Sequence, residues 1–257
     1  MFELLKNTAL RVSPVVAALA MAACGGGGGS SGGGGEPVAV ATTVKPGAFV
    51  TEIRYESGGV DEAITLLSPT GKFVTIVSEI DGTFGTLTFR SNNTFTGVGS
   101  SVFLDEVWES VNGSLEGRVI SSESLTATAT SPGFTSGSSF VRENTYSDLG
   151  VTLEAISGTY VMVDTTSTTV TITSDGAITG QDDSGCTFNG SVTIPDPRYN
   201  VFETVFSAAN CGDIPGGASG ALRDGEYQAL GAYDPDLLEL ELAGTDGDVV
   251  ALFIGSK

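Results

Sequence analysis

The sequence predicts an all-β protein built from antiparallel barrel or sandwich units, arranged as two related lobes. Several short stretches alternate apolar and polar residues with a period of two, which is typical of half-buried strands. Glycines interrupt the chain at short intervals, and no long stretch keeps the apolar period of an amphipathic helix. Many short strands separated by turn residues favour a barrel or a sandwich.

Three stretches carry the alternating pattern most clearly, at residues 86–89, 169–173 and 238–242. In the last of these, three leucines alternate with two glutamates, which predicts a strand with one apolar and one polar face. The pair Asp175-Gly176 follows the second stretch. Because Asp-Gly between alternating runs is a strong hairpin signal, we expect a turn there.

Four short segments of one half of the chain are similar, in the same order, to four segments of the other half. The pairs are 70–74 with 157–161, 86–89 with 169–172, 95–97 with 178–180, and 115–117 with 188–190. An ordered series of matches favours a duplication into two related lobes. The alternative is chance similarity among hairpins rich in threonine and glycine. The spacing is too long for a solenoid repeat and suits two small β units.

The N-terminal segment, residues 1–23, is typical of a secretory signal peptide. Lys6 and Arg11 give it a positive start, and residues 15–23 form an uninterrupted apolar stretch. A membrane-spanning helix needs about 20 apolar residues, so this stretch is too short to cross a bilayer. We therefore expect the segment to direct export and to be removed.

Residues 21–24, Met-Ala-Ala-Cys, resemble a bacterial lipobox directly behind this signal. The resemblance implies that Cys24 is lipidated and that N-terminal acyl chains hold the protein on a membrane. The alternative is ordinary signal cleavage that leaves Cys24 as a free, reactive thiol. Gly25 follows the cysteine, where an aspartate would resemble an inner-membrane retention signal. The resemblance therefore implies the outer membrane, and leaves open which face the body occupies.

Residues 25–35 contain nine glycines and two serines, which predicts a flexible tether. A phosphate-binding glycine loop would need a strand before it and a helix after it, whereas a cleaved signal precedes this run and Glu36-Pro37 follows. The predicted organisation is a signal peptide at 1–23, a lipidated cysteine with its tether at 24–45, an N-terminal β lobe at 46–147 and a C-terminal barrel-like lobe at 148–257. The sequence leaves open whether the lobes share one core.

Cys186 and Cys211 are the two cysteines that remain once Cys24 is assigned to lipid. Export places them in an oxidising compartment, so a structural disulfide is expected. The chain-entropy model gives such a loop about 3–4 kcal/mol of stabilisation. The alternatives are a redox pair, which usually has a Cys-x-x-Cys spacing, and a zinc site, which would need further cysteine or histidine ligands. The sequence offers neither.

The formal net charge is −20, and the chain has no histidine. The negative charge repels nucleic acid and anionic membrane surfaces, so no nucleic-acid partner is expected. The absence of histidine excludes Ser-His-Asp and Cys-His catalysis and the usual histidine sites for zinc, copper and haem. We therefore expect no enzymatic activity, no cofactor and no bound metal.

Carboxylate chemistry survives this exclusion, because a glycosidase needs two carboxyl groups about 5–10 Å apart and calcium prefers oxygen ligands. The densest acidic clusters are at residues 182–183, 234–236 and 246–248. Nearby glycine or proline favours solvated turns over catalytic or calcium sites there. Trp108, the only tryptophan, is interpreted as a core or rim residue rather than as a platform for a sugar or another ligand.

Leu149, Leu153 and Ile156 recur at helical spacing, which predicts a short helix or turn before residues 157–160. A helical turn that runs into a Gly-x-aromatic strand resembles the way in which calycin-type barrels begin. The resemblance covers only a few residues and implies a barrel in the second half of the chain.

The C-terminal half shows a broader resemblance, carried by residues 185–190, 199–201, Cys211 and 252–257. Together with the lipobox and the glycine run, these segments look like a group of uncharacterised proteobacterial outer-membrane lipoproteins with a C-terminal β domain and a cysteine pair. A more remote likeness is to two-lobed surface lipoproteins of the transferrin-binding type, from which no binding motif carries over. The resemblance implies an architecture and a location, and no activity.

These observations predict a lipid-anchored protein of the bacterial cell envelope with a non-enzymatic binding or structural role. Its partner, whether a protein or a small molecule, is left open. One alternative is a carrier that holds a small apolar molecule inside a barrel, because barrels of about eight strands can enclose one. The other is a carboxylate-based hydrolase that acts on envelope glycans.

Overall fold

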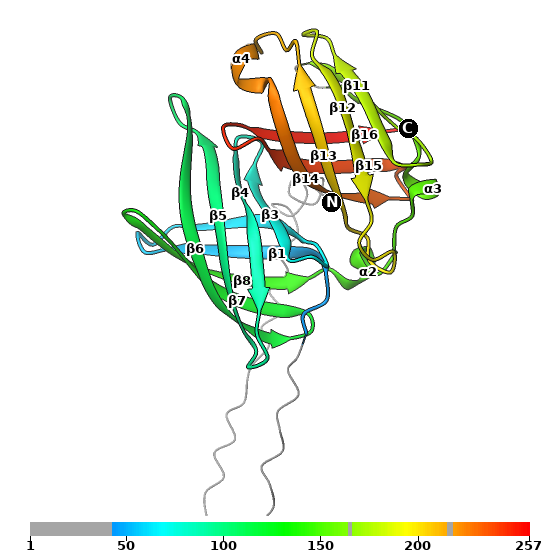
Figure 1. The fold of residues 1–257 in the computed structure, drawn as a ribbon. Coiled ribbons are helices and arrows are strands. Elements are labelled where there is room, and N and C mark those ends of the chain that lie inside the picture. Colours follow the sequence, from blue (N-terminus) through cyan, green and yellow to red (C-terminus); the bar gives the residue numbers. More distant parts are fainter. Residues whose placement is uncertain (1–42, 164–165, 215–217) are drawn as a thin grey trace, which may run out of the picture.

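The computed structural model describes residues 43–163, 166–214 and 218–257, which form two closed antiparallel β-barrels (Figure 1). The predicted all-β fold class with two related lobes is therefore confirmed. The predicted signal peptide, Cys24 and the tether at 25–35 lie outside the described residues. Within the described ranges, no helix has the length and apolar character that crossing a membrane requires.

The first barrel contains eight strands in sequence order, each paired with the next. They are β1 (Gly47–Tyr55), β2 (Val60–Leu67), β3 (Lys72–Ser78), β4 (Asp81–Phe89), β5 (Thr94–Leu104), β6 (Trp108–Ser121), β7 (Ser124–Ser131) and β8 (Phe134–Arg142). Strand β1 also pairs with β8, from Phe49 opposite Arg142 to Tyr55 opposite Ser136. This pairing closes the sheet and removes its free edges.

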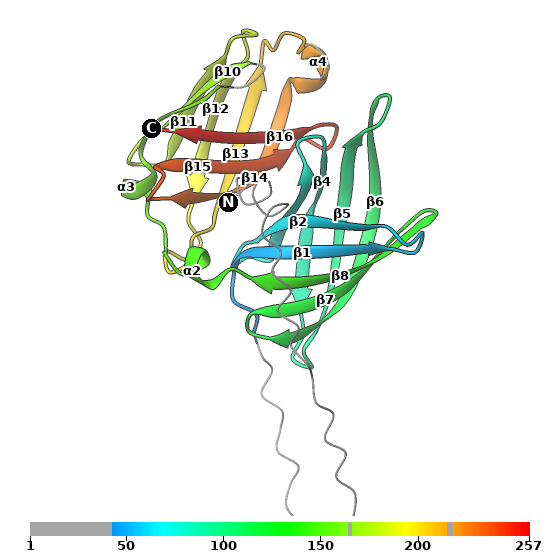
Figure 2. The ribbon, with the colours of Figure 1, turned by 180° about the vertical axis from the view of Figure 1, so that it is seen from behind.

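The second barrel repeats this up-and-down order. Its strands are β9 (Gly158–Val163), β10 (Ser167–Ile172), β11 (Ala177–Asp182), β12 (Thr187–Thr193), β13 (Phe202–Ala209), β14 (Gly225–Asp234), β15 (Glu239–Thr245) and β16 (Val250–Ser256). Strand β16 returns to β9 and closes the barrel, with Ser256 opposite Val161. The short helices α2 (Asn144–Ser147) and α3 (Leu153–Ile156) connect the two barrels, and α4 (Gly220–Arg223) precedes β14 (Figure 2).

Local sequence signals account for two of these connections. Gly176, in the predicted hairpin between β10 and β11, has a φ of +87°, a conformation that side chains with a Cβ rarely adopt. The predicted helical turn before β9 is α3, where the Thr152 side chain accepts a hydrogen bond from the backbone N–H of Ala155. This N-cap bond satisfies one of the free donors at the start of the helix.

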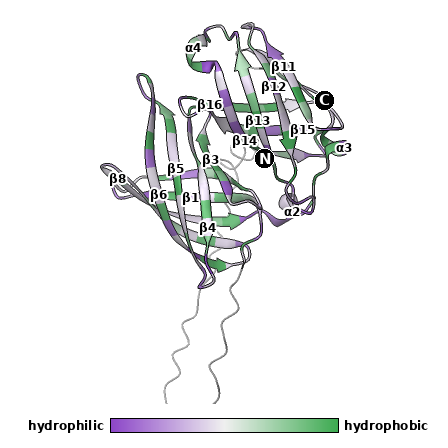
Figure 3. Cartoon of the chain, in the orientation of Figure 1, coloured by the Kyte–Doolittle hydropathy of each residue, from purple (hydrophilic) through white to green (hydrophobic). Residues whose placement is uncertain are grey.

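The barrels pack side by side through an apolar cluster that takes residues from both. Its buried members are Ala48, Ile64, Leu66, Val74, Ile76, Phe84 and Val102 from the first barrel, with Val201, Leu230, Ala232 and Ala243 from the second. Each barrel also has an internal cluster of its own. Figure 3 shows hydrophobic and hydrophilic residues mixed along the strands of both barrels. A strand of the interface therefore has two apolar faces, one toward its own lumen and one toward the other barrel.

The interface overturns one prediction about residues 238–242. Leu238 is exposed and lies before β15 in a turn with a φ of +54°, so the strand holds only the last two leucines. Glu241, expected on a polar face, is completely buried. The reason is that the first barrel and its connector cover this face of β15, and Tyr146 of α2 donates a hydrogen bond to Glu241 Oε2 at 3.1 Å. Alternation therefore indicated the strand but not what covers its polar face.

The similar segments found in the sequence do not fall at equivalent places in the two barrels. The matched segments align β3 to β6 of the first barrel with β9 to β12 of the second in sequence. Strand β3 is the third of its barrel, whereas β9 is the first. The similarity therefore relates hairpin units, shifted by two strands, rather than whole barrels in register.

Candidate functional site

One end of the first barrel is closed by apolar side chains. The buried members of this plug are Val44, Phe49, Leu67, Phe73, Leu87, Phe95, Val119, Leu125, Ala127 and Phe140. The chain enters the barrel at this end, because Val44 belongs to the plug and the Lys45 N–H donates to the Ser122 carbonyl oxygen at 2.8 Å. Lys45 Nζ also forms an ion pair with Glu123 at 3.3 Å.

The other end of the first barrel contains a cavity of about 590 Å³ that is open to the outside. We call this cavity the first lumen. Apolar groups in its wall include Ile53, Phe73, Val77, Phe103, Val111, Leu115, Ala129, Phe134 and Phe140. An eight-stranded barrel has room either for its own side chains or for one small ligand. The cavity shows that the side chains of the first barrel do not fill its lumen completely.

A glycine helps to keep this space free. Gly99 of β5 lines the first lumen, and a Cβ atom at this position would lie only 2.4 Å from the carbonyl oxygen of Phe84. Strands β4 and β5 therefore approach each other too closely here for any larger residue. The close approach leaves a part of the wall without a side chain.

Hydroxyl groups cover much of the remaining wall. Thr51 and Thr75 line the first lumen, and the Oγ1 atom of each lies 2.8 Å from that of Thr65, a buried residue of β2. Thr83 and Ser101 form a similar pair at 2.9 Å. Because these hydroxyls on neighbouring strands bond to one another, they add neutral polar groups to the wall beside its apolar side chains.

Carboxylates lie at the mouth of the first lumen. Asp81, at the start of β4, lines the cavity and is half-buried. Burial, and then the negative charge of Asp61, raise the pKa of Asp81 above its usual value. Tyr55 at the end of β1 donates a hydrogen bond to Asp61 Oδ2 at 2.7 Å, and its ring lies 5.4 Å from that of Phe134. Burial, followed by this hydrogen bond, raises the pKa of the Tyr55 hydroxyl.

The charge in the wall of the first lumen is negative. Asp81 is the only charged residue among the described residues that line it. Of the ion pairs found in the described part of the chain, none involves Asp81. A carboxylate that faces a partly apolar space without a cationic partner carries a desolvation cost that a cationic ligand can offset.

The second barrel contains a cavity of about 330 Å³, which we call the second lumen. Its wall is mainly apolar, with Val170, Ile178, Phe188, Phe206, Leu242 and Phe253 among its members. The first barrel contributes Glu79, Ile80 and Trp108 to this wall. Trp108 packs against both the interface cluster and the second barrel, in keeping with its interpretation as a core or rim residue. Its Nε1 atom is buried and has no hydrogen-bond partner among the described residues.

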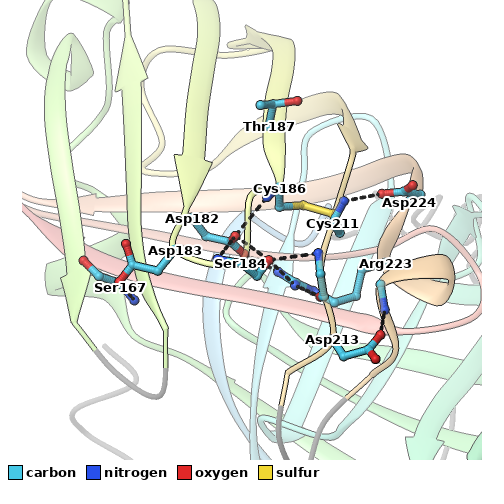
Figure 4. Close-up of polar contacts among 12 residues, drawn as sticks. Ser167, Asp182, Asp183, Ser184, Cys186, Thr187, Cys211, Asp213, Arg223 and Asp224 are labelled. Atoms are coloured by element: carbon cyan, nitrogen blue, oxygen red, sulfur yellow. Dashed lines mark hydrogen bonds and ion pairs between the residues drawn. A yellow bond between two sulfur atoms is a disulfide. The ribbon is translucent and has the colours of Figure 1, made fainter.

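A polar network surrounds the disulfide of the second barrel (Figure 4). Cys186 and Cys211 are joined in the bridge that the sequence predicts. Next to it, Asp182 forms an ion pair with Arg223 of α4. Asp182 Oδ1 also accepts hydrogen bonds from the Ser184 hydroxyl at 2.6 Å and from the Cys186 N–H at 3.1 Å. Burial raises the pKa of Asp182, but the bonds from Ser184 and Arg223 outweigh it, so that the pKa lies below its usual value.

The structure corrects the interpretation of one acidic cluster and supports that of two others. Asp182 is not a solvated turn residue, because its side chain is 1% exposed and fully engaged. Asp234 and Asp246 do act as turn residues: each accepts backbone N–H bonds from residues two and three positions later. Among the described residues no group of three or more carboxylates or cysteines is placed to hold a metal ion.

The sequence pattern does not single out the residues that define the first lumen. Asp81 precedes a glycine and therefore reads as turn punctuation, and the wall threonines are only a few of many in this chain. Tyr55 and Asp81 come together because β1 and β4 both place one end at the mouth of a closed barrel. The signal that could have found them is the period-two position of each residue on its strand, counted from a known register.

Comparison with known proteins adds no further information. No protein-family model matches the chain, and no curated protein or solved structure matches it either. The described residues form a pair of up-and-down β-barrels, and hydroxyl groups line the larger of the two cavities described above.

Proposed function

We propose that this protein is a non-enzymatic binding protein of the bacterial cell envelope that holds a small amphipathic molecule in the first lumen. The observation that carries the proposal is the open cavity of about 590 Å³, in which apolar groups alternate with paired hydroxyls. Binding pockets for small molecules are concave, largely apolar and contain a few placed polar groups. The proposal combines the two possibilities that the sequence left open, an envelope-anchored binding protein and a carrier.

The proposed anchor and the proposed binding site fit together in space. Residue 43 is the first described residue, and Val44 lies in the apolar plug at the closed end of the first barrel. A tether that precedes it would therefore attach at the closed end. The mouth, where Tyr55 and Asp81 lie, is at the other end of the barrel, so such a tether would not obstruct it.

Binding of N-phenyl-1-naphthylamine, a neutral apolar fluorophore, tests this proposal. The fluorescence of the probe is expected to rise on binding to the purified protein. In the variant Ala129→Phe the new ring occupies the first lumen. We expect the affinity for the probe to fall by about tenfold or more. Thr128→Phe is the matched control, because residue 128 is exposed on the opposite face of the same strand, β7, and its affinity should equal that of the original protein.

A third variant separates the two barrels. Ala251→Phe places the same ring in the second lumen, and binding should remain intact. Absence of probe binding would overturn the proposal, as would a loss of binding in Ala251→Phe with none in Ala129→Phe. Circular dichroism of each variant establishes that the β fold is present before its affinity is interpreted.

The proposed anchor is tested separately in cells. Radiolabelled palmitate is expected to enter the protein and to be lost completely in Cys24→Ala, because only this cysteine follows the lipobox-like residues 21–23. Label that enters both forms equally, or neither, would reject the anchor and leave the lumen experiment unaffected.

A further inference from the structure

We infer that the first lumen selects cationic amphiphiles, in which an apolar stem carries a protonated amine, over neutral and anionic molecules with the same stem. This inference rests on the proposed function and adds the chemical class of the ligand.

The charges of the lumen exclude an anionic ligand first. A carboxylate or phosphate would need a lysine, an arginine or free N–H donors in the cavity. The described residues that line the first lumen include no lysine or arginine, and Asp81 would repel an anion directly. Arg54, near the end of β1, is 66% exposed and forms an ion pair with Glu52 at 2.6 Å. An anion that entered the lumen would therefore lose its hydration without gaining a counter-charge.

The same arrangement favours a cation. Asp81 lines the cavity at its mouth, and the carboxylate of Asp61 is close enough to influence its titration. A protonated amine placed there would form a charge-assisted hydrogen bond with Asp81 and would relieve the repulsion between the two carboxylates. The net charge of −20 also raises the concentration of cations around the protein as a whole.

Aromatic rings at the mouth strengthen this preference. Tyr55, Phe103 and Phe134 all line the first lumen, at the ends of β1 and β5 and the start of β8. The rings of Tyr55 and Phe134 lie 5.4 Å apart with an interplanar angle of 55°. Ring faces attract ammonium groups, most strongly where water is partly excluded. The mouth thus offers a cation both a counter-charge and aromatic surface.

The apolar floor of the lumen favours an apolar stem on the ligand. Phe73, Leu115 and Phe140 belong both to the lumen wall and to the apolar plug or its edge, so the floor of the cavity is apolar. An apolar stem would lie toward this floor, with the amine at the mouth. Between the floor and the mouth, the hydroxyls of Thr51 and Thr75, each bonded to Thr65, can also form a hydrogen bond with a hydroxyl on the stem.

Displacement of N-phenyl-1-naphthylamine by three molecules with the same stem tests the inference. They are dodecylammonium, dodecanol and dodecanoate, used below the concentrations at which they form micelles. We expect dodecylammonium to bind about tenfold more tightly than dodecanol, since one charge-assisted hydrogen bond is worth about 1.4 kcal/mol or more. Dodecanoate should bind more weakly than either of them.

The variant Asp81→Asn assigns the preference to one side chain. It should bring the affinities for dodecylammonium and dodecanol together, because dodecylammonium loses its charged partner and binds about tenfold more weakly. Asp105→Asn is the matched control, because it removes the same charge from an exposed position between β5 and β6 at the same end of the barrel. It should preserve the tenfold preference.

The outcomes distinguish this inference from the proposed function. If the probe does not bind, or if no competitor displaces it, the proposed function fails. If dodecanol and dodecanoate displace it as well as dodecylammonium does, the lumen binds molecules but the cationic preference is wrong. A preference that persists in Asp81→Asn, or that disappears in Asp105→Asn, would also overturn the assignment.

Discussion

The two barrels have the same number of strands in the same sequential order, but Asp81 in the first lumen and Asp182 in the second differ in their partners. In the second barrel, Asp182 is paired with Arg223 and receives hydrogen bonds from Ser184 and Cys186. In the first barrel, Asp81 lines a larger cavity without an ion pair among the described residues. Asp182 is part of the framework, whereas Asp81 has no counter-charge among the described residues.

The opposite pKa shifts of these carboxylates have one explanation. Burial raises the pKa of both, but only Asp182 has partners that favour its charged form strongly enough to lower it. The disulfide between Cys186 and Cys211 lies beside Asp182, so a covalent bond and a buried ion pair stabilise the same end of the second barrel. The order of the strands is therefore the same in both barrels, while a few inward side chains decide whether a carboxylate in the lumen has a counter-charge among the described residues.

Removal of Arg223 should make Asp182 resemble Asp81, a carboxylate without a counter-charge, and should have the largest effect on stability of the predicted substitutions. Arg223→Met leaves the carboxylate of Asp182, whose side chain is 1% exposed, without its counter-charge. We expect the free energy of unfolding to fall by about 3 kcal/mol, the lower part of the range for a broken buried pair, because Ser184 and Cys186 still donate to Asp182. Chemical denaturation followed by tyrosine and tryptophan fluorescence measures the loss.

Arg198→Met is the matched control for that substitution. Arg198 also pairs with an aspartate, Asp196, at 2.6 Å, but its side chain is 77% exposed. Solvent-exposed pairs contribute about 0–1 kcal/mol, so this variant should unfold nearly as the original protein does. Equal losses in the two variants would show that burial of the Arg223–Asp182 pair is not what makes it important.

The sequence was sufficient to predict the fold class and several local elements. Residues 169–173 predicted strand β10, in which Thr168, Val170 and Ile172 are the buried positions. Asp175-Gly176 predicted the hairpin that follows, and the apolar spacing before residue 157 predicted α3. These features depend on neighbours in the chain, whose chemistry a sequence shows directly.

The partners across the molecule could not be predicted in this way. Glu241 follows the same alternation as an exposed glutamate, and only the packing of the barrels buries it. Asp182 has the sequence neighbours of a turn residue, and its ion pair with Arg223, which is distant in the chain, is visible only in the structure. The position of Asp81 at the mouth of a lumen depends on the register of eight strands, and no local pattern encodes that register.

The contact between the barrels gives a smaller, pH-dependent test. Glu203 of β13 accepts hydrogen bonds from Ser68 and Thr70 of the first barrel, both at 2.5 Å, and pairs with Lys72 at 2.8 Å. Burial raises the pKa of Glu203, but the hydrogen bonds from Lys72, Ser68 and Thr70 lower it by a larger amount. The pKa of Glu203 in the folded protein therefore lies below its usual value. The ionised form therefore stabilises the joined barrels.

The sign of the pH effect follows from this depressed pKa. The stabilisation is complete above the pKa of the unfolded chain, about 4.3, and is lost as the pH falls through the lower pKa of the folded state. Glu203→Gln should therefore be less stable by about 1–2 kcal/mol near neutral pH, since Lys72 is partly exposed and the pair is partly screened. The difference should shrink toward zero in acid, where the protonated carboxyl of Glu203 resembles the amide.

Unfolding measured over a series of pH values, with Glu226→Gln as the control on an exposed glutamate of β14, would resolve this effect. A difference between the original protein and Glu203→Gln that stays constant from neutral to acid pH would mean that the carboxylate charge contributes nothing to joining the barrels. In that case, the apolar cluster around Ile64, Leu66 and Leu230 would hold them together without electrostatic help.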